Sequence, residues 1–146
     1  MAFVIDETVQ IDAPAGVVWK VLTDLGSYGE WNSYVPDCRS TLEPGAPIEM
    51  KVNLGGSTPR KQREFIKSFT PGSEFSYGMK PVPLGALHSH RSHTVTPVDD
   101  GRCTYRSYFE LDGWLSPVVR TALGKALHKG FGDMTAEVKT RAEQVR

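Results

Sequence analysis

The stretch RCTYRSYFELDGWLSP, residues 102–117, contains the change of period that decides the fold. Up to Leu111 its odd positions are mostly apolar and its even positions mostly polar, which is typical of a strand with one buried face. Ser116 as N-cap and Pro117 as first helical residue then predict a helix. Apolar residues follow at spacings of three and four: Leu123, Leu127, Phe131, Met134, Val138 and Ala142. We therefore expect a strand with an inward odd side, followed by a long helix that runs close to Arg146.

The chain before this stretch begins with a strand over residues 3–11, which are rich in β-branched side chains. Pro14 is suited to the first position of a helix that ends near Gly26, and a short second helical turn carries Tyr28 and Trp31. Further strands are predicted at 37–43, 46–54, 60–69, 73–80, 86–97 and 102–112. Tight turns such as Glu43-Pro44-Gly45 and Asp99-Asp100-Gly101 join only antiparallel neighbours.

One long helix cannot cover both faces of so large a sheet. The sequence therefore predicts an α+β fold in which a curved seven-stranded antiparallel sheet wraps around the C-terminal helix, with two short helices after the first strand. Such a sheet leaves a hollow between itself and the helix.

The composition fits a single domain spanning residues 1–146. Lysine plus arginine and aspartate plus glutamate each total 17, so the formal net charge is zero and we expect no nucleic-acid partner. The N-terminus lacks the features of a signal peptide, and no apolar run approaches the ~18 residues of a membrane span. We expect a cytoplasmic protein without stable membrane insertion or cofactor, with Cys38 and Cys103 as free thiols. The sequence does not indicate an oligomeric state.

The segment LHSHRSHTV, residues 87–95, holds three histidines and one arginine. The odd positions have apolar ends, so we expect Arg91 and His93 to face inward and His88 and His90 to face solvent. His88 and His90 could offer two imidazoles to zinc, but no third ligand follows at a recognisable spacing, and we predict no metal site. An inward Arg91 needs a partner: either a carboxylate such as Glu49, with His93 bonded to a hydroxyl, or a ligand.

Several motifs resemble the START-like superfamily, also called SRPBCC: Ile11-Asp12-Ala13-Pro14 before Val17-Val18-Trp19, and Asp24-Leu25 before Tyr28-Gly29-Glu30-Trp31-Asn32. Near the C-terminus, Leu111–Pro117 and Gly130-Phe131 through Met134 to Lys139 and Glu143 are similar to its polyketide cyclase/dehydrase and lipid-transport branch. The resemblance implies a helix-grip fold: a seven-stranded antiparallel sheet that grips the C-terminal helix over a hydrophobic cavity. The superfamily includes lipid carriers, quinone-binding proteins, hormone receptors and aromatase/cyclases, so fold analogy does not choose a function.

We expect an apolar chamber with a few polar anchors, the usual form of a small-molecule site. The predicted walls are Trp31, Met50, Tyr77, Met79, Leu87, Tyr105, Phe109, Leu127 and Phe131. The predicted anchors are Ser89, Arg91, His93 and Ser107. The links at 54–59, 80–86 and 113–117 should lie at one end of the meander and form an adjustable entrance; they carry the apolar residues Leu54, Val82, Leu84, Trp114 and Leu115.

Three functions are compatible with this pattern. The first is binding or transport of a small hydrophobic molecule such as a lipid, a quinone or a polyketide-like aromatic. The second is a cyclase or aromatase, in which His93 would act as general acid/base and Arg91 would stabilise an enolate. The third is an interaction module that recruits a partner enzyme. No nucleophile motif, phosphate loop or carboxylate pair is present, which favours binding over catalysis.

Overall fold

The computed structural model describes residues 2–56 and 58–146 and confirms the predicted helix-grip architecture. The elements are β1 (Phe3–Ile11), α1 (Ala15–Thr23), η1 (Leu25–Glu30), β2 (Asp37–Ser40), β3 (Pro47–Val52), β4 (Arg60–Thr70), β5 (Glu74–Gly78), η2 (Pro83–Gly85), β6 (His88–Asp99), β7 (Arg102–Asp112) and α2 (Ser116–Val145). The seven strands form one sheet in the order β1-β7-β6-β5-β4-β3-β2, and every neighbouring pair is antiparallel.

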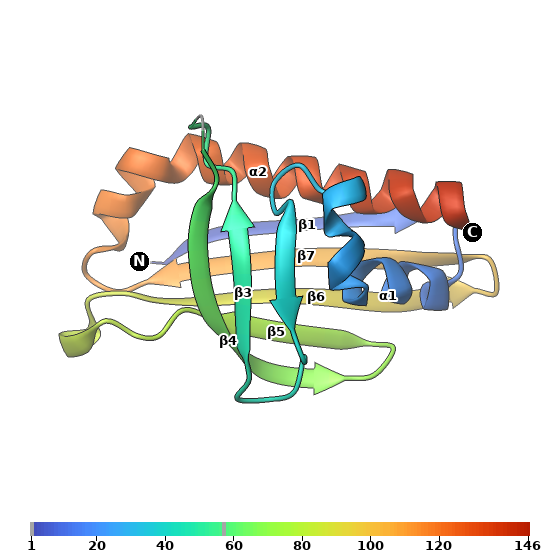
Figure 1. Ribbon diagram of the computed structural model, residues 1–146, viewed down its shortest axis with the longest axis horizontal. Coiled ribbons are helices and arrows are strands. Elements are labelled where there is room, and N and C mark those ends of the chain that lie inside the picture. Colours follow the sequence, from blue (N-terminus) through green and yellow to red (C-terminus); the bar gives the residue numbers. More distant parts are fainter. Residues whose placement is uncertain (1, 57) are drawn as a thin grey trace.

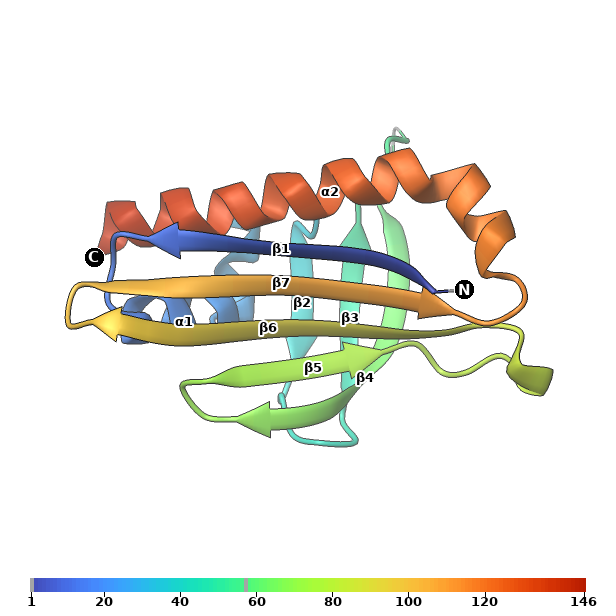
Figure 2. The same cartoon turned by 180° about the vertical axis from the view of Figure 1, so that it is seen from behind.

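The sheet curves strongly, so that its two ends lie in different layers. Figures 1 and 2 show β1, β7 and β6 running alongside α2, whereas β2, β3 and β4 cross them on the other side of the molecule. Helix α2 packs on β1, β7 and α1. The concave face of the sheet and one side of α2 therefore enclose the interior.

The predicted inward side is confirmed on the last strands. On β6, Ser89, Arg91, His93 and Val95 are buried, while the even positions between them are at least partly exposed. Pairing of β6 with β5 and β7 keeps this parity, because Arg91 lies between Tyr77 and Phe109 in the register.

Strand β4, whose facing is ambiguous in the sequence, changes parity at a bulge. Its register with β5 shifts between Ile66 and Ser68. Ile66 is buried, and Phe69, three positions later, also packs inward against Trp19. A bulge inserts one extra residue, so that even positions face inward on one side of it and odd positions on the other. Before the bulge, the even positions therefore face the interior.

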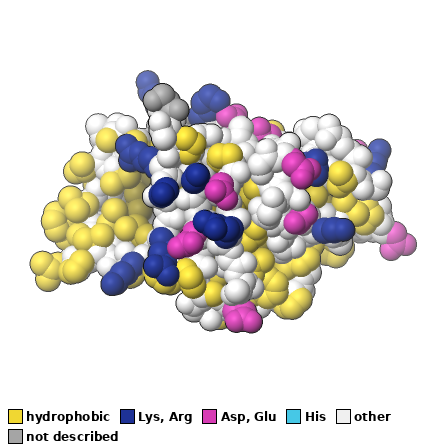
Figure 3. Space-filling model, viewed as in Figure 1, with side chains coloured by type: hydrophobic (Ala, Val, Ile, Leu, Met, Phe, Trp, Pro, Cys, Tyr) yellow, Lys and Arg dark blue, Asp and Glu magenta, His cyan; other side chains and the backbone are white. Residues whose placement is uncertain are grey.

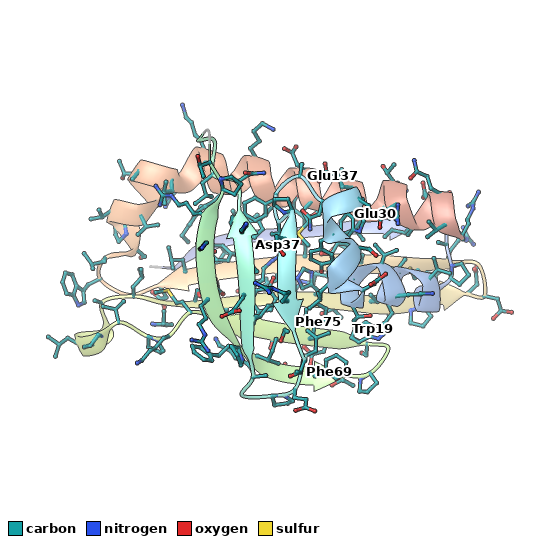
Figure 4. All side chains as sticks on the ribbon, in the orientation of Figure 1. Trp19, Glu30, Asp37, Phe69, Phe75 and Glu137 are labelled. Atoms are coloured by element: carbon teal, nitrogen blue, oxygen red, sulfur yellow. The ribbon has the colours of Figure 1, made fainter. Side chains whose placement is uncertain are left out.

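Aromatic packing closes the end of the interior near α1. The Trp19 ring meets Phe75 edge-on at 5.9 Å between centroids and lies 5.6 Å from Phe69; Figure 4 shows the three side chains converging. On the same side, η1 is tied to α2 by the ion pair between Arg141 and Glu30 at 2.8 Å. The free space lies toward the other end.

Small differences from the predicted boundaries occur at both helix starts. Pro14 is the cap of α1 and not its first residue, and Ser116 is already inside α2, with Leu115 at the cap. Strand β2 ends at Ser40, earlier than predicted, and Leu42 beyond it adopts a positive φ of 62° that a strand does not allow. Cys38 and Cys103 are buried free thiols, as predicted. Among the described residues, no helix combines the length and hydropathy needed to cross a bilayer.

Two glycines of α2 should respond oppositely to a methyl group. At Gly130 an added Cβ would overlap the Tyr34 ring, whereas at Gly124 the nearest atoms, in Arg120 and Phe3, lie 3.7 and 4.0 Å away. We expect Gly130→Ala to lower the free energy of unfolding by about 1–3 kcal/mol through overpacking. Gly124→Ala should raise it by about 0.5–1 kcal/mol, because alanine is the better helix former. Urea unfolding of both variants checks this; equal effects would show that Tyr34 moves aside freely.

Candidate functional site

A cavity of about 340 Å³ lies between the concave face of the sheet and α2. This volume is near the lower end of the range for small-molecule sites. Helix α2 contributes one face of regularly spaced side chains, and strands β3 to β7 together with residues of the adjoining loops contribute the rest. The lining residues are Tyr34, Val35, Met50, Val52, Leu54, Gln62, Arg63, Glu64, Tyr77, Met79, Leu87, Ser89, Arg91, Phe109, Leu111, Val119, Leu123, Leu127, Phe131 and Met134.

Most of the predicted site residues lie in this lining: Met50, Tyr77, Met79, Leu87, Ser89, Arg91, Phe109, Leu127 and Phe131. Four predicted residues are placed elsewhere. His93, Tyr105 and Ser107 are fully buried behind the lining, and Trp31 packs on Tyr28 at 5.0 Å between ring centroids. Contact of any of them with a ligand stays a prediction.

Arg91 is the one predicted anchor that brings a fixed charge to the cavity. It is 3% exposed; Nη1 donates to Ser107 Oγ at 2.6 Å. Nη2 lies 3.6 Å from Met134 Sδ, and the guanidinium carbon lies 4.5 Å from the centre of the Phe131 ring. The Ser107 hydroxyl, the Met134 thioether and the Phe131 ring hold the Arg91 side chain in place, but none of them neutralises its positive charge.

The carboxylate partner that the sequence suggested for Arg91 is not there. Glu49 lies on the exposed side of β3, where it faces Arg63 at 3.9 Å. Within the described parts of the chain, no ion pair joins Arg91 to a carboxylate. Arginine does not lose its proton in proteins, so the cavity wall carries a positive charge that no carboxylate contacts directly. This arrangement can bind an anionic or strongly oxygenated group.

Glu64 is a cavity residue that the sequence reading missed. It precedes the β4 bulge, so its even position turns inward, and it lines the cavity with Gln62. Burial raises the pKa of the Glu64 carboxyl to about 7, against the opposing influence of Arg91 and Lys67. The structure gives Glu64 no hydrogen bond or ion pair to another described residue. It therefore changes charge near neutral pH inside an otherwise apolar chamber.

His93 is enclosed and has bonded partners. Its Nδ1 lies 2.6 Å from Tyr105 Oη, as expected for a hydroxyl partner, and its ring stacks on Phe75 at 4.8 Å. Burial, followed by the charge of Arg91, holds the pKa of His93 well below its usual value. The imidazole is therefore neutral, and no part of it lines the cavity. This placement disfavours direct proton exchange between His93 and a ligand.

The two outer histidines are separated from this chemistry. His88 faces Asp112 at 3.9 Å, and His90 Nδ1 lies 3.4 Å from Lys67 Nζ. Within residues 2–56 and 58–146, no three His, Cys, Asp or Glu side chains gather as a metal ion requires.

The end of the cavity opposite α1 is bordered by loops. The link after β5 is bonded to the link after β7: Leu115 N donates to Ala86 O at 2.9 Å. Leu54, from the link after β3, lines the same cavity as Leu87 and Val119, and all three are partly exposed. Two of the three predicted links thus lie together, and Leu54 of the third, which includes residue 57 outside the described chain, shares the cavity lining; an adjustable entrance stays a prediction. Val82, Leu84 and Trp114 do not line the cavity but stand outside it in solvent.

The model of the family described as polyketide cyclase / dehydrase and lipid transport matches residues 2–143. The chain belongs to this family. The description joins enzymes with lipid carriers, so membership supports ligand binding or cyclisation without choosing between them. Comparison with curated protein sequences finds no match.

Solved structures of the START superfamily and of aromatase/cyclases share the fold. The Zhui aromatase/cyclase from a Streptomyces species is 17% identical, with a TM-score of 0.81 over 100% of this chain and 97% of its own. A START superfamily protein from Mycobacterium smegmatis is 14% identical, with a TM-score of 0.73 over 98% and 99%. Norcoclaurine synthase from Thalictrum flavum is 13% identical, with a TM-score of 0.71 over 100% and 89%. At these identities the likeness concerns the fold alone.

Proposed function

We propose that the protein binds a small, largely apolar molecule with an anionic or oxygenated end inside the cavity. The observation that carries this proposal is the buried, uncompensated charge of Arg91 in the wall of an apolar chamber. Apolar burial at about 25 cal/mol per Å² would supply most of the affinity. The guanidinium would fix the direction in which the ligand lies.

The energetics of Arg91 support a ligand rather than a purely structural role. A buried charge without a counter-ion costs folding free energy, and an apolar side chain of similar volume would avoid that cost. Its bonding to Ser107 and stacking on Phe131 orient the group but do not neutralise it. A charge that is both costly and well oriented is typical of a binding site.

Filling the cavity should abolish binding without unfolding the protein. Leu127 is on the α2 face of the cavity, and Leu127→Trp would occupy part of the 340 Å³. We expect the purified wild-type protein to release an apolar molecule in native mass spectrometry and to enhance the fluorescence of anilinonaphthalene sulfonate. Both signals should be lost in Leu127→Trp, since the space for the ligand is gone.

Ala136→Trp is the matched control, because Ala136 is an exposed position of the same helix. It should retain both signals. A wild-type protein that carries no molecule and does not bind the dye would contradict the proposal. So would a Leu127→Trp variant that binds the dye as strongly as wild type, provided that circular dichroism shows both variants folded.

A second candidate function is proton transfer during cyclisation, and Glu64 favours it. A base with a pKa near 7 is well matched to neutral pH, and Glu64 shares the cavity with a fixed cation. In such a step the Glu64 carboxylate takes a proton from the carbon beside a ketone. The electron pair of that C–H bond becomes a carbon–carbon double bond, and the π pair of the carbonyl moves to the ketone oxygen, whose negative charge Arg91 stabilises. Aromatase/cyclases are among the proteins that share this fold, which is compatible with this chemistry.

A further inference from the structure

Four large apolar side chains stand in solvent at the loop end of the molecule. Leu84 is 92% exposed, Trp114 65%, Val118 62% and Val82 37%. We call these four residues the apolar tip. Figure 3 shows hydrophobic side chains gathered at this end, at the left of the view, over η2 and the start of α2. Isolated apolar residues are common on surfaces, but a contiguous group usually marks an interaction site.

The apolar tip is held in shape by bonds between its two loops. Trp114 Nε1 donates to Leu84 O at 3.1 Å, and Leu115 N donates to Ala86 O at 2.9 Å. Leu84 itself has a φ of +65°, a left-handed conformation that leucine rarely adopts. Local backbone preference therefore does not explain a leucine at this position. Leu84 contributes an apolar side chain that projects into solvent.

The two loops that carry the apolar tip contain basic but no acidic residues. Residues 79–89 and 113–128, which form or adjoin the two bonded loops of this end, contain no aspartate or glutamate. Their exposed lysine and arginine side chains are Lys80, Arg120 and Lys125. The acidic residue next to these segments, Asp112, is already engaged by His88 and by the amide of Gly113. A chain of zero net charge thus presents a basic, apolar end, and Figure 3 shows lysine and arginine bordering the hydrophobic group.

We propose that the apolar tip docks on the surface of an anionic lipid bilayer. Leu84, Val82 and Val118 would enter the boundary between headgroups and acyl chains, and the bordering cations would contact lipid phosphates. Tryptophan suits this boundary because one edge of its ring is polar. The tip projects from the molecule and its own loops carry only basic charged side chains, Lys80 and Arg120 nearest to it, which fits a broad anionic surface better than a protein groove.

Docking of the apolar tip would also bring the cavity close to the lipid. Leu87 and Val119, which line the cavity, follow directly on the tip segments along the chain. If the proposed ligand binding is correct, docking would bring the loop end of the cavity against the lipid from which an apolar ligand can enter. The docking itself does not depend on ligand binding and is tested without any added ligand.

Sedimentation with vesicles tests the docking. Wild-type protein should bind vesicles of phosphatidylcholine with phosphatidylserine at least tenfold more tightly than vesicles of phosphatidylcholine alone, with weakening as salt is added. Leu84→Asn should reduce binding by about tenfold, since it removes a large apolar side chain. Asparagine tolerates the left-handed conformation, so this variant should fold as well as wild type. Combined Lys80→Gln and Arg120→Gln should weaken binding by about fivefold per charge.

Val98→Asn is the matched control. Val98 is 53% exposed near the hairpin between β6 and β7, at the opposite end of the molecule, and this change should leave vesicle binding unaltered. Leu127→Trp should also bind vesicles normally, so a failure of ligand binding would not be confused with a failure of docking. Absence of binding to anionic vesicles would overturn the proposal. A dimer seen in analytical ultracentrifugation and lost in Leu84→Asn would overturn it too, by assigning the tip to a protein interface.

Discussion

Arg91→Met is expected to weaken binding of anilinonaphthalene sulfonate by about 10- to 100-fold, because a hydrogen bond to a charged group contributes about 1.5–3 kcal/mol. Methionine keeps much of the volume of the side chain and its contacts with Phe131 and Met134. The cavity should therefore keep its shape while losing its fixed charge. Fluorescence titration at pH 6 measures the change under conditions in which Glu64 is mostly protonated.

The same substitution should leave the free energy of unfolding unchanged or raise it. Arg91 loses its hydration on folding and gains mainly one hydrogen bond to Ser107 in return. Removing a buried charge that lacks a counter-ion removes this cost. Weaker binding together with equal or greater stability is typical of a residue retained for function. Urea unfolding at the same pH gives the second half of the comparison.

Two controls make the Arg91 experiment specific. Neutral phenylnaphthylamine has the same ring system as the first dye but no sulfonate, so its affinity should change little in Arg91→Met. Arg106→Met removes an arginine from the outer face of β7, where it pairs with Asp6 at 2.8 Å, and should not affect either dye. Equal loss of both dyes in Arg91→Met would mean that the cavity has collapsed. Unchanged sulfonate affinity would show that Arg91 is not an anchor.

The inward positions of Arg91 and His93 could be predicted from the sequence because a strand repeats every two residues. The apolar residues Tyr105, Phe109 and Leu111 set the parity of β7, and short turns carry that parity to its antiparallel neighbours. Burial of both side chains confirms this part of the prediction. The helix-grip fold could likewise be predicted, since it follows from a meander, a final helix and the motifs that resemble the superfamily.

Glu64 could not be predicted in the same way, because the β4 bulge breaks the period. The sequence does contain a signal: Ile66 and Phe69 are both apolar, yet they have opposite parity. Both can face inward only if one residue is inserted between them, and the register shift before Ser68 is this insertion. If Ile66 is taken as inward, the even positions before it also face inward, and these are Glu64 and Gln62.

The different surroundings of Arg91 and His93 also lay beyond the sequence. They are two residues apart on one face of β6, yet only Arg91 lines the cavity. His93 is covered by Phe75, its register partner on β5, and is bonded to Tyr105 of β7. These neighbours are brought together by pairing between distant segments. A local sequence pattern predicts which face of a strand a residue occupies, but it does not predict where along that face the cavity lies.

Glu64→Gln is expected to raise the free energy of unfolding at pH 8 by up to about 3 kcal/mol relative to wild type. Burial shifts the carboxyl pKa from 4.5 to about 7, and each pKa unit corresponds to about 1.36 kcal/mol. Because the folded state holds the proton more tightly than the unfolded state, ionisation of Glu64 opposes folding. The cost is absent below pH 4.5, grows between pH 4.5 and 7, and is complete above pH 7. Glutamine avoids it while keeping nearly the same shape.

Urea unfolding of both proteins from pH 4 to pH 8 measures this difference. The stabilities should converge at the acidic end and separate as the pH rises through 7. Glu49→Gln is the control, because Glu49 is exposed on β3 and should change stability by less than about 0.5 kcal/mol at every pH. Parallel curves for Glu64→Gln and wild type would show that folding does not raise the pKa of Glu64, and that its charge is stabilised despite its position.

Comparison of wild type with Glu64→Gln also distinguishes ligand binding from proton transfer. The charged groups that act on Glu64 are Arg91 and Lys67, which both favour its ionised form, and the neighbouring Tyr34 stays neutral because burial raises its pKa. An anionic dye should therefore bind wild type more weakly as the pH rises through 7, when Glu64 gains its charge. Binding to Glu64→Gln should be independent of pH over this range. If the protein is only a binder, deuterium exchange beside the carbonyl of a bound aryl ketone, followed by NMR, will be the same in both proteins; if Glu64 is a base, exchange will be lost in Glu64→Gln while the ketone still binds.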